Sequence, residues 1–82
     1  MNDAIFALVQ TIAADVFRVP KSSISAAASP NQIEAWDSIQ NVNLVMSIEQ
    51  QFSIQFDTGD LENMKTIGDI TDVLSRKLGR QT

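Results

Sequence analysis

Three segments of this chain carry apolar residues at the spacing of an α-helix, about every three to four positions, so the expected fold is all-α. The first predicted helix spans residues 3 to 18, because Pro20 cannot continue a helix. The second spans 38 to about 52, and the last runs from a cap at Thr66 to a stop at Gly79. The first and last helices share this pattern at Ile5, Leu8, Val9, Ile12, Val16, Ile67, Ile70, Val73, Leu74 and Leu78.

The connections between these helices differ in length. Residues 21 to 37 mix Ser, Ala, Pro and Asn without a sustained period, which predicts a long ordered loop held to the core by Ile24, Ile33 and Trp36. Residues 53 to 56 are expected to be extended or irregular, and residues 57 to 59 to form a turn before a short helix at 60 to 64. The predicted architecture is therefore three main helices plus one short helix, with the long loop between helices one and two.

The length of 82 residues favours one domain, residues 1 to 82, with one modest core. A large enclosed active site is not expected in a chain of this size. The predicted core consists of Phe6, Val9, Ile12, Leu44, Ile48, Phe52, Ile54, Ile70 and Leu74.

The chain contains no cysteine and no histidine. This removes disulfides, thiolate metal sites, cysteine nucleophiles and the commonest general base, so we expect neither an enzyme nor a metal site. An acidic cluster at Asp57, Asp60 and Glu62 has the wrong spacing for an EF-hand loop. A solvated turn and a weak surface site for divalent ions both remain open for this cluster.

The formal net charge of −4 is concentrated in the centre of the chain. Between Glu34 and Asp72, eight acidic residues face one basic residue, Lys65. Such a surface repels nucleic acid and favours basic protein partners, although it could equally serve solubility. No apolar run is long enough for a membrane span, and the N-terminus lacks the basic residues of a signal peptide, so a cytoplasmic protein is expected.

The second predicted helix has two apolar faces. Leu44, Val45, Ile48 and Phe52 fall on one of them, and Ile39, Val42, Met46 and Glu49 fall on the adjacent one. Either neighbouring helices bury both faces, or one face is core and the other is a docking surface for partner proteins.

The same helix begins at an Asp-Ser pair. Asp37 is a favoured N-cap, with Gln40 at the third helical position where a capping box would place it. Ser38 then lies in the first turn, where unpaired backbone N–H groups and the helix dipole favour an attached anion such as a phosphodiester. Such a pair by itself is most often only a cap.

A longer pattern surrounds this pair. The run Asp37-Ser38-Ile39, with Val42, Leu44-Val45-Met46, Ile48-Glu49, Phe52 and Ile54, and then Thr66-Ile67-Gly68-Asp69-Ile70, resembles the acyl carrier protein family. The resemblance covers residues 36 to 74 most fully. It implies a four-helix carrier-protein bundle in which a phosphopantetheinyl transferase moves 4'-phosphopantetheine from coenzyme A to Ser38.

The resemblance also implies roles for the neighbouring residues. Asp37 would cap the helix and help present Ser38 to the transferase. An acyl-loading ligase or synthase and acyl-using enzymes would be the other partners of a monomeric carrier. The partner-facing residues would be Ile39, Val42, Met46 and Glu49.

The sequence departs from the family pattern at two points, and the second of them, the low charge of the second helix, favours a dedicated stand-alone carrier over the housekeeping carrier of fatty acid synthesis. Ile39 replaces the usual Leu, and Glu49 is the only carboxylate of the second helix after Asp37, where the family usually has several. Trp36 resembles the residue found in carriers served by adenylating ligases, although its expected physical role is to anchor the loop to the core. A peptidyl carrier and an unmodified helical interaction module are the alternative functions.

Overall fold

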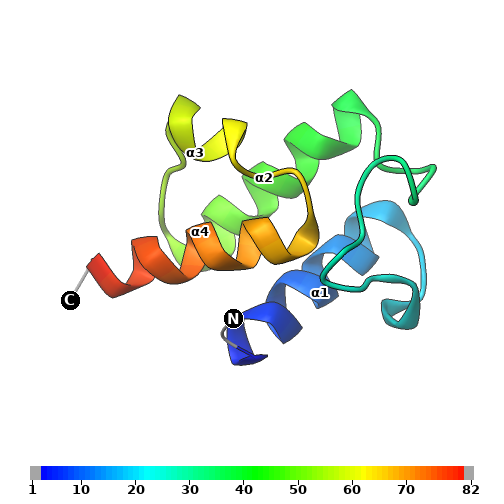
Figure 1. Ribbon diagram of the computed structural model, residues 1–82, viewed down its shortest axis with the longest axis horizontal. Helices are drawn as coiled ribbons and strands as arrows, with labels where there is room; N and C mark the ends of the chain where they lie inside the picture. The colour runs from blue at the N-terminus through cyan, green and yellow to red at the C-terminus, as the bar shows by residue number, and fades with distance from the viewer. Residues whose placement is uncertain (1–2, 81–82) are drawn as a thin grey trace.

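The computed structural model describes residues 3–80, except for the side chain of Arg80, and confirms the all-α class. Within that range the α-helices are α1 (Asp3–Phe17), α2 (Ser38–Phe52), α3 (Thr58–Glu62) and α4 (Ile67–Arg80), with a 3-10 helix, η1 (Lys21–Ser23), in the first loop (Figure 1). These residues measure 35 × 24 × 19 Å along their principal axes. Three main helices and one short helix agree with the predicted architecture.

Helix α1 is the central packing partner, because it contacts both α2 and α4. Val9 and Ala13 have no exposed surface, and Phe17 retains 3%. The helix ends when Arg18 adopts a left-handed conformation with φ of 57°, which lets the Val19 N–H reach the Ala14 carbonyl at 3.1 Å. The prediction of residues 3 to 18 was therefore accurate to within one residue.

The core joins all three main helices with the loop and the segment before α3. Of the nine predicted core residues, Val9, Leu44, Ile48, Ile54, Ile70 and Leu74 are buried, whereas Phe6, Ile12 and Phe52 are only partly buried against the cluster. The predicted core list omitted several other buried residues, although Val45, Ile67 and Val73 among them had been placed on apolar helix faces. The omitted residues are Ala13, Phe17, Ala28, Val45, Phe56, Met64, Ile67, Thr71 and Val73.

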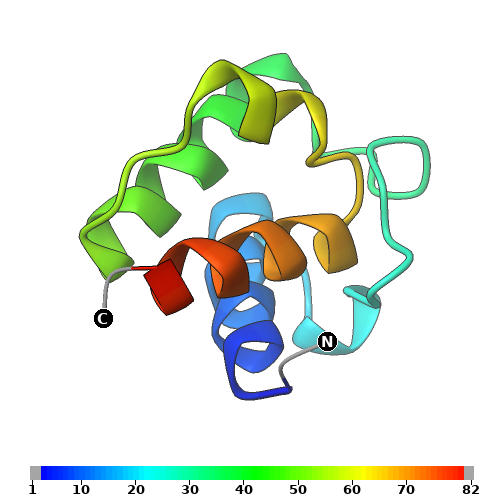
Figure 2. The same ribbon diagram turned by 60° about the vertical axis from the view of Figure 1, so that its left-hand side comes forward.

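The long loop between α1 and α2 is tied to the start of α4 by backbone hydrogen bonds. The Ile67 N–H donates to the Ala28 carbonyl at 3.1 Å, and the Gly68 N–H donates to the Ala26 carbonyl at 2.8 Å. These two N–H groups would otherwise be unpaired at the first turn of α4. Figures 1 and 2 show the loop at the end of the molecule opposite the C-terminal end of α4. Its three predicted anchors, Ile24, Ile33 and Trp36, are all buried, as expected.

The boundaries of α3 and α4 differ from the sequence predictions. Asp57, predicted to lie in a turn, is the N-cap of α3, and a reciprocal capping box with Asp60 starts the helix at Thr58 instead of residue 60. Helix α4 is capped by Thr66 as predicted, since its hydroxyl oxygen accepts from the Asp69 N–H at 3.0 Å. It does not stop at Gly79, because the helix continues to Arg80.

Candidate functional site

The start of α2 is fixed by Asp37. This residue has extended backbone geometry, and its carboxylate accepts a hydrogen bond from the Gln40 N–H at 2.9 Å. The predicted capping box is only half formed, because the Gln40 side chain does not return to Asp37. Its amide instead donates to the Val16 carbonyl at 3.4 Å, which joins the first turn of α2 to the end of α1.

Ser38 is the first residue of α2, and its side chain is exposed. The first N–H groups of a helix have no intrahelical acceptor, and the helix dipole makes this end positive. An oxygen that carries a negatively charged phosphodiester is therefore stabilised at this position. The Ser38 side chain is exposed and therefore accessible to a partner enzyme.

Trp36 holds the site to the core. Its ring retains 3% of its surface and lies 5.3 Å from the Phe17 ring between centroids. Its indole N–H donates to the Asn41 side-chain oxygen at 2.9 Å. Trp36 and Asn41 lie on either side of Ser38 in the sequence, so this bond fixes both flanks of the exposed serine. The predicted role of Trp36 as an anchor is confirmed.

Three of the predicted partner-facing residues form an exposed apolar face on α2, which we call the α2 face. Ile39, Val42 and Met46 keep 74%, 55% and 50% of their surface exposed. Leu44, Val45 and Ile48 of the same helix are buried. Neighbouring helices therefore bury one apolar face of α2, and not both.

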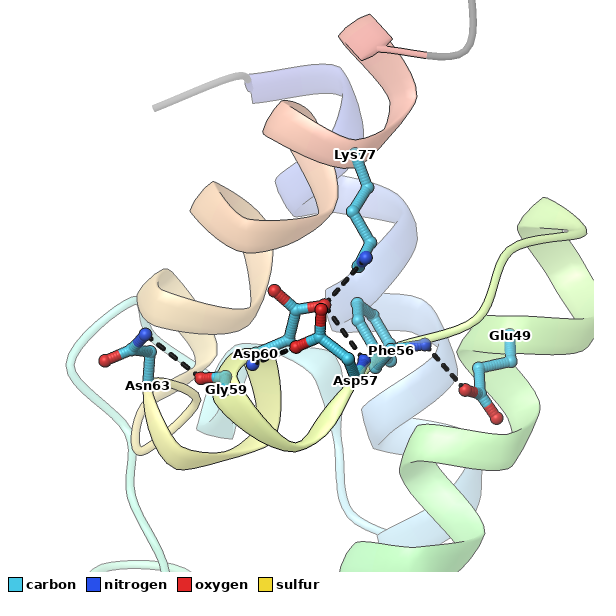
Figure 3. A network of polar contacts seen from close by, with 7 residues as sticks. All are labelled: Glu49, Phe56, Asp57, Gly59, Asp60, Asn63 and Lys77. Carbon is cyan, nitrogen blue, oxygen red and sulfur yellow. Dashed lines mark hydrogen bonds and ion pairs between the residues drawn. The ribbon is translucent and has the colours of Figure 1, made fainter.

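Glu49, the fourth predicted partner-facing residue, is not free on that face. It is partly buried, and its carboxylate accepts a hydrogen bond from the Phe56 N–H at 2.9 Å (Figure 3). Helical periodicity placed Glu49 beside Met46, but a contact with the segment that follows α2 turns its side chain toward that segment. The Glu49 carboxylate therefore has a partner within this chain, and its role toward partner proteins stays a prediction.

The acidic cluster around α3 is a network of internal polar contacts. Asp60 accepts from the Asp57 N–H at 3.0 Å and pairs with the Lys77 ammonium of α4 at 2.7 Å (Figure 3). The hydrogen bond from Lys77, followed by that from the Asp57 N–H, lowers the pKa of the Asp60 carboxyl below its ordinary value of 3.8. Among residues 3–80, no group of three or more acidic side chains is arranged to hold a metal ion, so the divalent-ion alternative has no support in that range.

A groove opens directly beside Ser38. It has a volume of about 640 Å³ and is formed by residues 29–31 of the long loop, the start of α2, and residues 64–66 before α4. Trp36, Ser38 and Lys65 are among its lining residues. An extended group attached to the Ser38 oxygen could therefore lie in this groove, along the surface of the protein.

Two residues of this site, Lys65 and Asn41, were not predicted from the sequence. Lys65 was noted only as the single basic residue of the acidic centre, and its place in the groove depends on the loop folding toward residues 64–66. The contact between Asn41 and Trp36 was not predicted. The only sequence signal for it is the short separation of five positions, which allows a local contact.

Comparisons with known proteins agree with this arrangement. The family model described as "Phosphopantetheine attachment site" matches residues 7–74. The acyl carrier protein of Thermotoga maritima is 34% identical over 78 residues, which cover 95% of this chain and 96% of the relative. The acyl carrier protein of Petrotoga mobilis is 30% identical over 77 residues, covering 94% and 91%.

A solved structure has the same fold. The solution NMR structure of a holo acyl carrier protein from Geobacter metallireducens matches with a TM-score of 0.84 and 33% identity, covering 93% of this chain and 87% of the other. The all-helical fold and these matches define a small helical domain that bears a covalently attached phosphopantetheine. The chain belongs to the acyl carrier protein family. It carries acyl groups on a covalently attached phosphopantetheine, and so has the general function that its sequence predicted.

Proposed function

We propose that Ser38 is the residue to which phosphopantetheine is attached, and that the whole chain acts as one carrier domain. The observation that supports this most strongly is the position of Ser38, exposed and first in α2, within the matched residues 7–74. Asp37 supports the role by fixing the start of the helix without occupying the serine hydroxyl.

The attachment reaction transfers a phosphoryl group. The Ser38 oxygen forms a bond to the phosphorus next to the pantetheine portion of coenzyme A, and the pyrophosphate bond breaks. Adenosine 3',5'-bisphosphate leaves, and the hydroxyl proton passes to the transferase. Because the first turn of α2 favours negative charge, this chain stabilises the phosphodiester product at Ser38.

When bound, the group supplies a thiol that holds the acyl cargo as a thioester. The chain contains neither cysteine nor histidine, so its own role is to bear the arm, to keep the attachment point accessible and to bind partners. In this proposal the partner enzymes perform the chemistry and the carrier is not itself a catalyst. We further propose that it acts as a monomer in the cytoplasm.

The α2 face is the proposed contact for the transferase and for the enzymes that load and use the cargo. Its three apolar side chains begin next to Ser38, so a partner seated on them would have the attachment point within reach. Apolar area removed from water stabilises such a contact by roughly 25 cal/mol per Å² before the costs of association are subtracted. The flexible thioether of Met46 suits a surface that must accept several partners.

The low charge of α2 supports a carrier dedicated to one pathway. Asn43, Gln50 and Gln51 are exposed on this helix, and its only carboxylate, Glu49, is held by Phe56. Steering by strongly basic partner enzymes should therefore be weaker than for a carrier with many acids on this helix. Binding to a fatty acid ketosynthase as tight as that of a strongly acidic carrier would contradict this part of the proposal.

Intact mass spectrometry tests the attachment. The apo protein is incubated with coenzyme A, Mg²⁺ and a broad-specificity phosphopantetheinyl transferase, and one addition of about 340 Da is expected. Ser38→Ala should show no addition. Ser29→Ala is the matched control, because Ser29 lines the same groove, and it should gain the full mass.

The alternative functions have distinct outcomes. Absence of any addition, under conditions that modify another carrier, would favour an unmodified interaction module. A peptidyl carrier would gain the same arm but would then accept an amino acid from an adenylating enzyme, and not an acyl group.

A further inference from the structure

The groove beside Ser38 has a composition suited to a ligand with one charged end and a less polar body. Its apolar lining comes from Pro30, Trp36 and Met64, and Asn31 adds an exposed amide. Its volume of about 640 Å³ lies within the range of roughly 300 to 1,000 Å³ that small-molecule sites occupy. Ser38 itself lines the groove, so a group attached to its oxygen begins at the groove.

Lys65 is the only basic residue among those that line this groove. Its side chain is exposed, and no ion-pair partner for its ammonium lies among residues 3–80. The other charged residue of the lining is Asp37, which would repel a phosphodiester on the adjacent serine. Lys65 is therefore the side chain of the groove that can balance the charge of that phosphodiester.

We infer that this groove is the resting site of the phosphopantetheine arm, with the Lys65 ammonium paired to the phosphodiester and the pantetheine portion lying along Pro30 and Met64. The inference rests on attachment at Ser38, as proposed above. The arm contains methyl groups that match the apolar side chains and amides that match Asn31.

This resting site has a consequence for partner binding. The arm lies on the side of Ser38 formed by the loop and residues 64–66, and so leaves the α2 face uncovered. A partner can then bind Ile39, Val42 and Met46 before the arm leaves the groove. The resting arm and the bound partner occupy different surfaces.

Isotope-filtered NMR tests the inference at the level of contacts. The apo protein is labelled with ¹³C and ¹⁵N, and the arm is added enzymatically from unlabelled coenzyme A. Nuclear Overhauser effects between the arm methyl groups and the protein then report which side chains the arm touches. We expect contacts with the methyl group of Met64 and the ring of Pro30, together with a ³¹P shift that depends on Lys65.

Charge variants test whether the positive charge of Lys65 holds the arm in the groove, or whether Lys65 only lies near the arm. Lys65→Gln should weaken the contacts to Met64 and Pro30 about twofold or more, since it removes the attraction but not the apolar lining. Lys21→Gln, a change at another exposed lysine outside the groove, should leave them unchanged. About 1 M NaCl, at which the Debye length is about 3 Å, should reproduce the effect of Lys65→Gln in the unchanged protein.

Each outcome has a defined meaning. Arm contacts with Ile39, Val42 or Met46, or no contacts at all in protein that has gained the arm, would overturn the resting site and leave attachment at Ser38 intact. Contacts that persist at full strength in Lys65→Gln would overturn the role of Lys65. Protein that gains no arm mass would contradict the attachment itself, and so the failures of the two proposals are distinguishable.

Discussion

The Glu49 carboxylate at the end of α2 accepts a hydrogen bond from the Phe56 N–H at 2.9 Å. The next N–H in the chain, that of Asp57, donates to the Asp60 carboxylate, which in turn pairs with Lys77 of α4. Carboxylates therefore link α2 to the segment before α3, and α3 to α4 (Figure 3). This network holds the short helix α3 in place.

The Glu49 contact predicts a stabilising role for that residue. Glu49→Ala should lower the free energy of unfolding by about 1 to 3 kcal/mol, because it leaves the Phe56 N–H without its acceptor. Glu49→Gln should cost less, since the amide oxygen can still accept. Chemical denaturation measures both, with the exposed neighbour Gln50→Ala as a control that should change little. Equal stability of all three variants would show that the Phe56 contact is unimportant.

The α2 face should affect partner binding more than stability. Val42→Lys changes an exposed side chain, so the free energy of unfolding should shift by no more than about 0.5 kcal/mol. The rate of arm transfer should nevertheless fall about tenfold, because a charge replaces an apolar contact worth roughly 1.4 kcal/mol.

Val45→Ala is the matched control on the buried face of the same helix. It should lower the free energy of unfolding by about 1 to 3 kcal/mol, with little effect on transfer at temperatures where the variant is folded. A large loss of stability in Val42→Lys would mean that the exposed face has been mistaken for a packing surface.

The Asp60 and Lys77 pair should contribute to stability in a pH-dependent way. Because the pKa of Asp60 is lowered in the folded state, the contribution is fully present above the ordinary value of 3.8 and is lost as the pH falls through the folded-state pKa. Asp60→Asn should therefore be less stable than the unchanged protein at pH 7, by a modest amount for a pair near the surface, and the difference should disappear below the folded-state pKa.

A double-mutant cycle with Lys77→Met isolates that pair. Once Lys77 is absent, Asp60→Asn should cause little further loss at pH 7. Arg76→Met, a change at the exposed neighbouring cation, should not alter the effect of Asp60→Asn. A difference between Asp60→Asn and the unchanged protein that is independent of pH would contradict the assigned ionisation.

Two glycines of α4 should respond oppositely to alanine. In Gly68→Ala the new Cβ would lie 3.0 Å from the Ala26 carbonyl oxygen, at the point where the loop bonds to α4, so we expect a loss of stability. Gly79→Ala meets nothing within 4 Å and should gain up to about 1 kcal/mol from helix propensity. Thermal denaturation compares the two. Stabilisation by both substitutions would show that the loop can move at Ala26 to make room for the new Cβ.

Local chemistry allowed the main helices to be predicted from sequence. Asp37 begins α2 and Thr66 caps α4, since a cap depends only on residues within three positions. Trp36 could be assigned to the core because a large aromatic residue in a polar loop has few other environments.

The errors involve contacts that sequence spacing does not contain. The internal hydrogen bond of Glu49 was not predicted, because its donor, the Phe56 N–H, lies seven residues further along the chain. Gly59 indicated a turn, but the reciprocal bonds of Asp57 and Asp60 make that region the start of α3. Lys65 lines the groove beside Ser38 only because the long loop folds next to residues 64–66. Counting charged residues along the sequence cannot reveal this contact.

Fragmentation mass spectrometry of the modified protein tests the central claim most directly. After treatment with coenzyme A and the transferase, fragment ions that end on either side of Ser38 locate the added mass of about 340 Da. The account predicts that every fragment containing Ser38 carries the addition and that fragments ending at Asp37 or beginning at Ile39 do not. An addition found on another residue, such as Ser29 or Ser47, would contradict the assignment of Ser38.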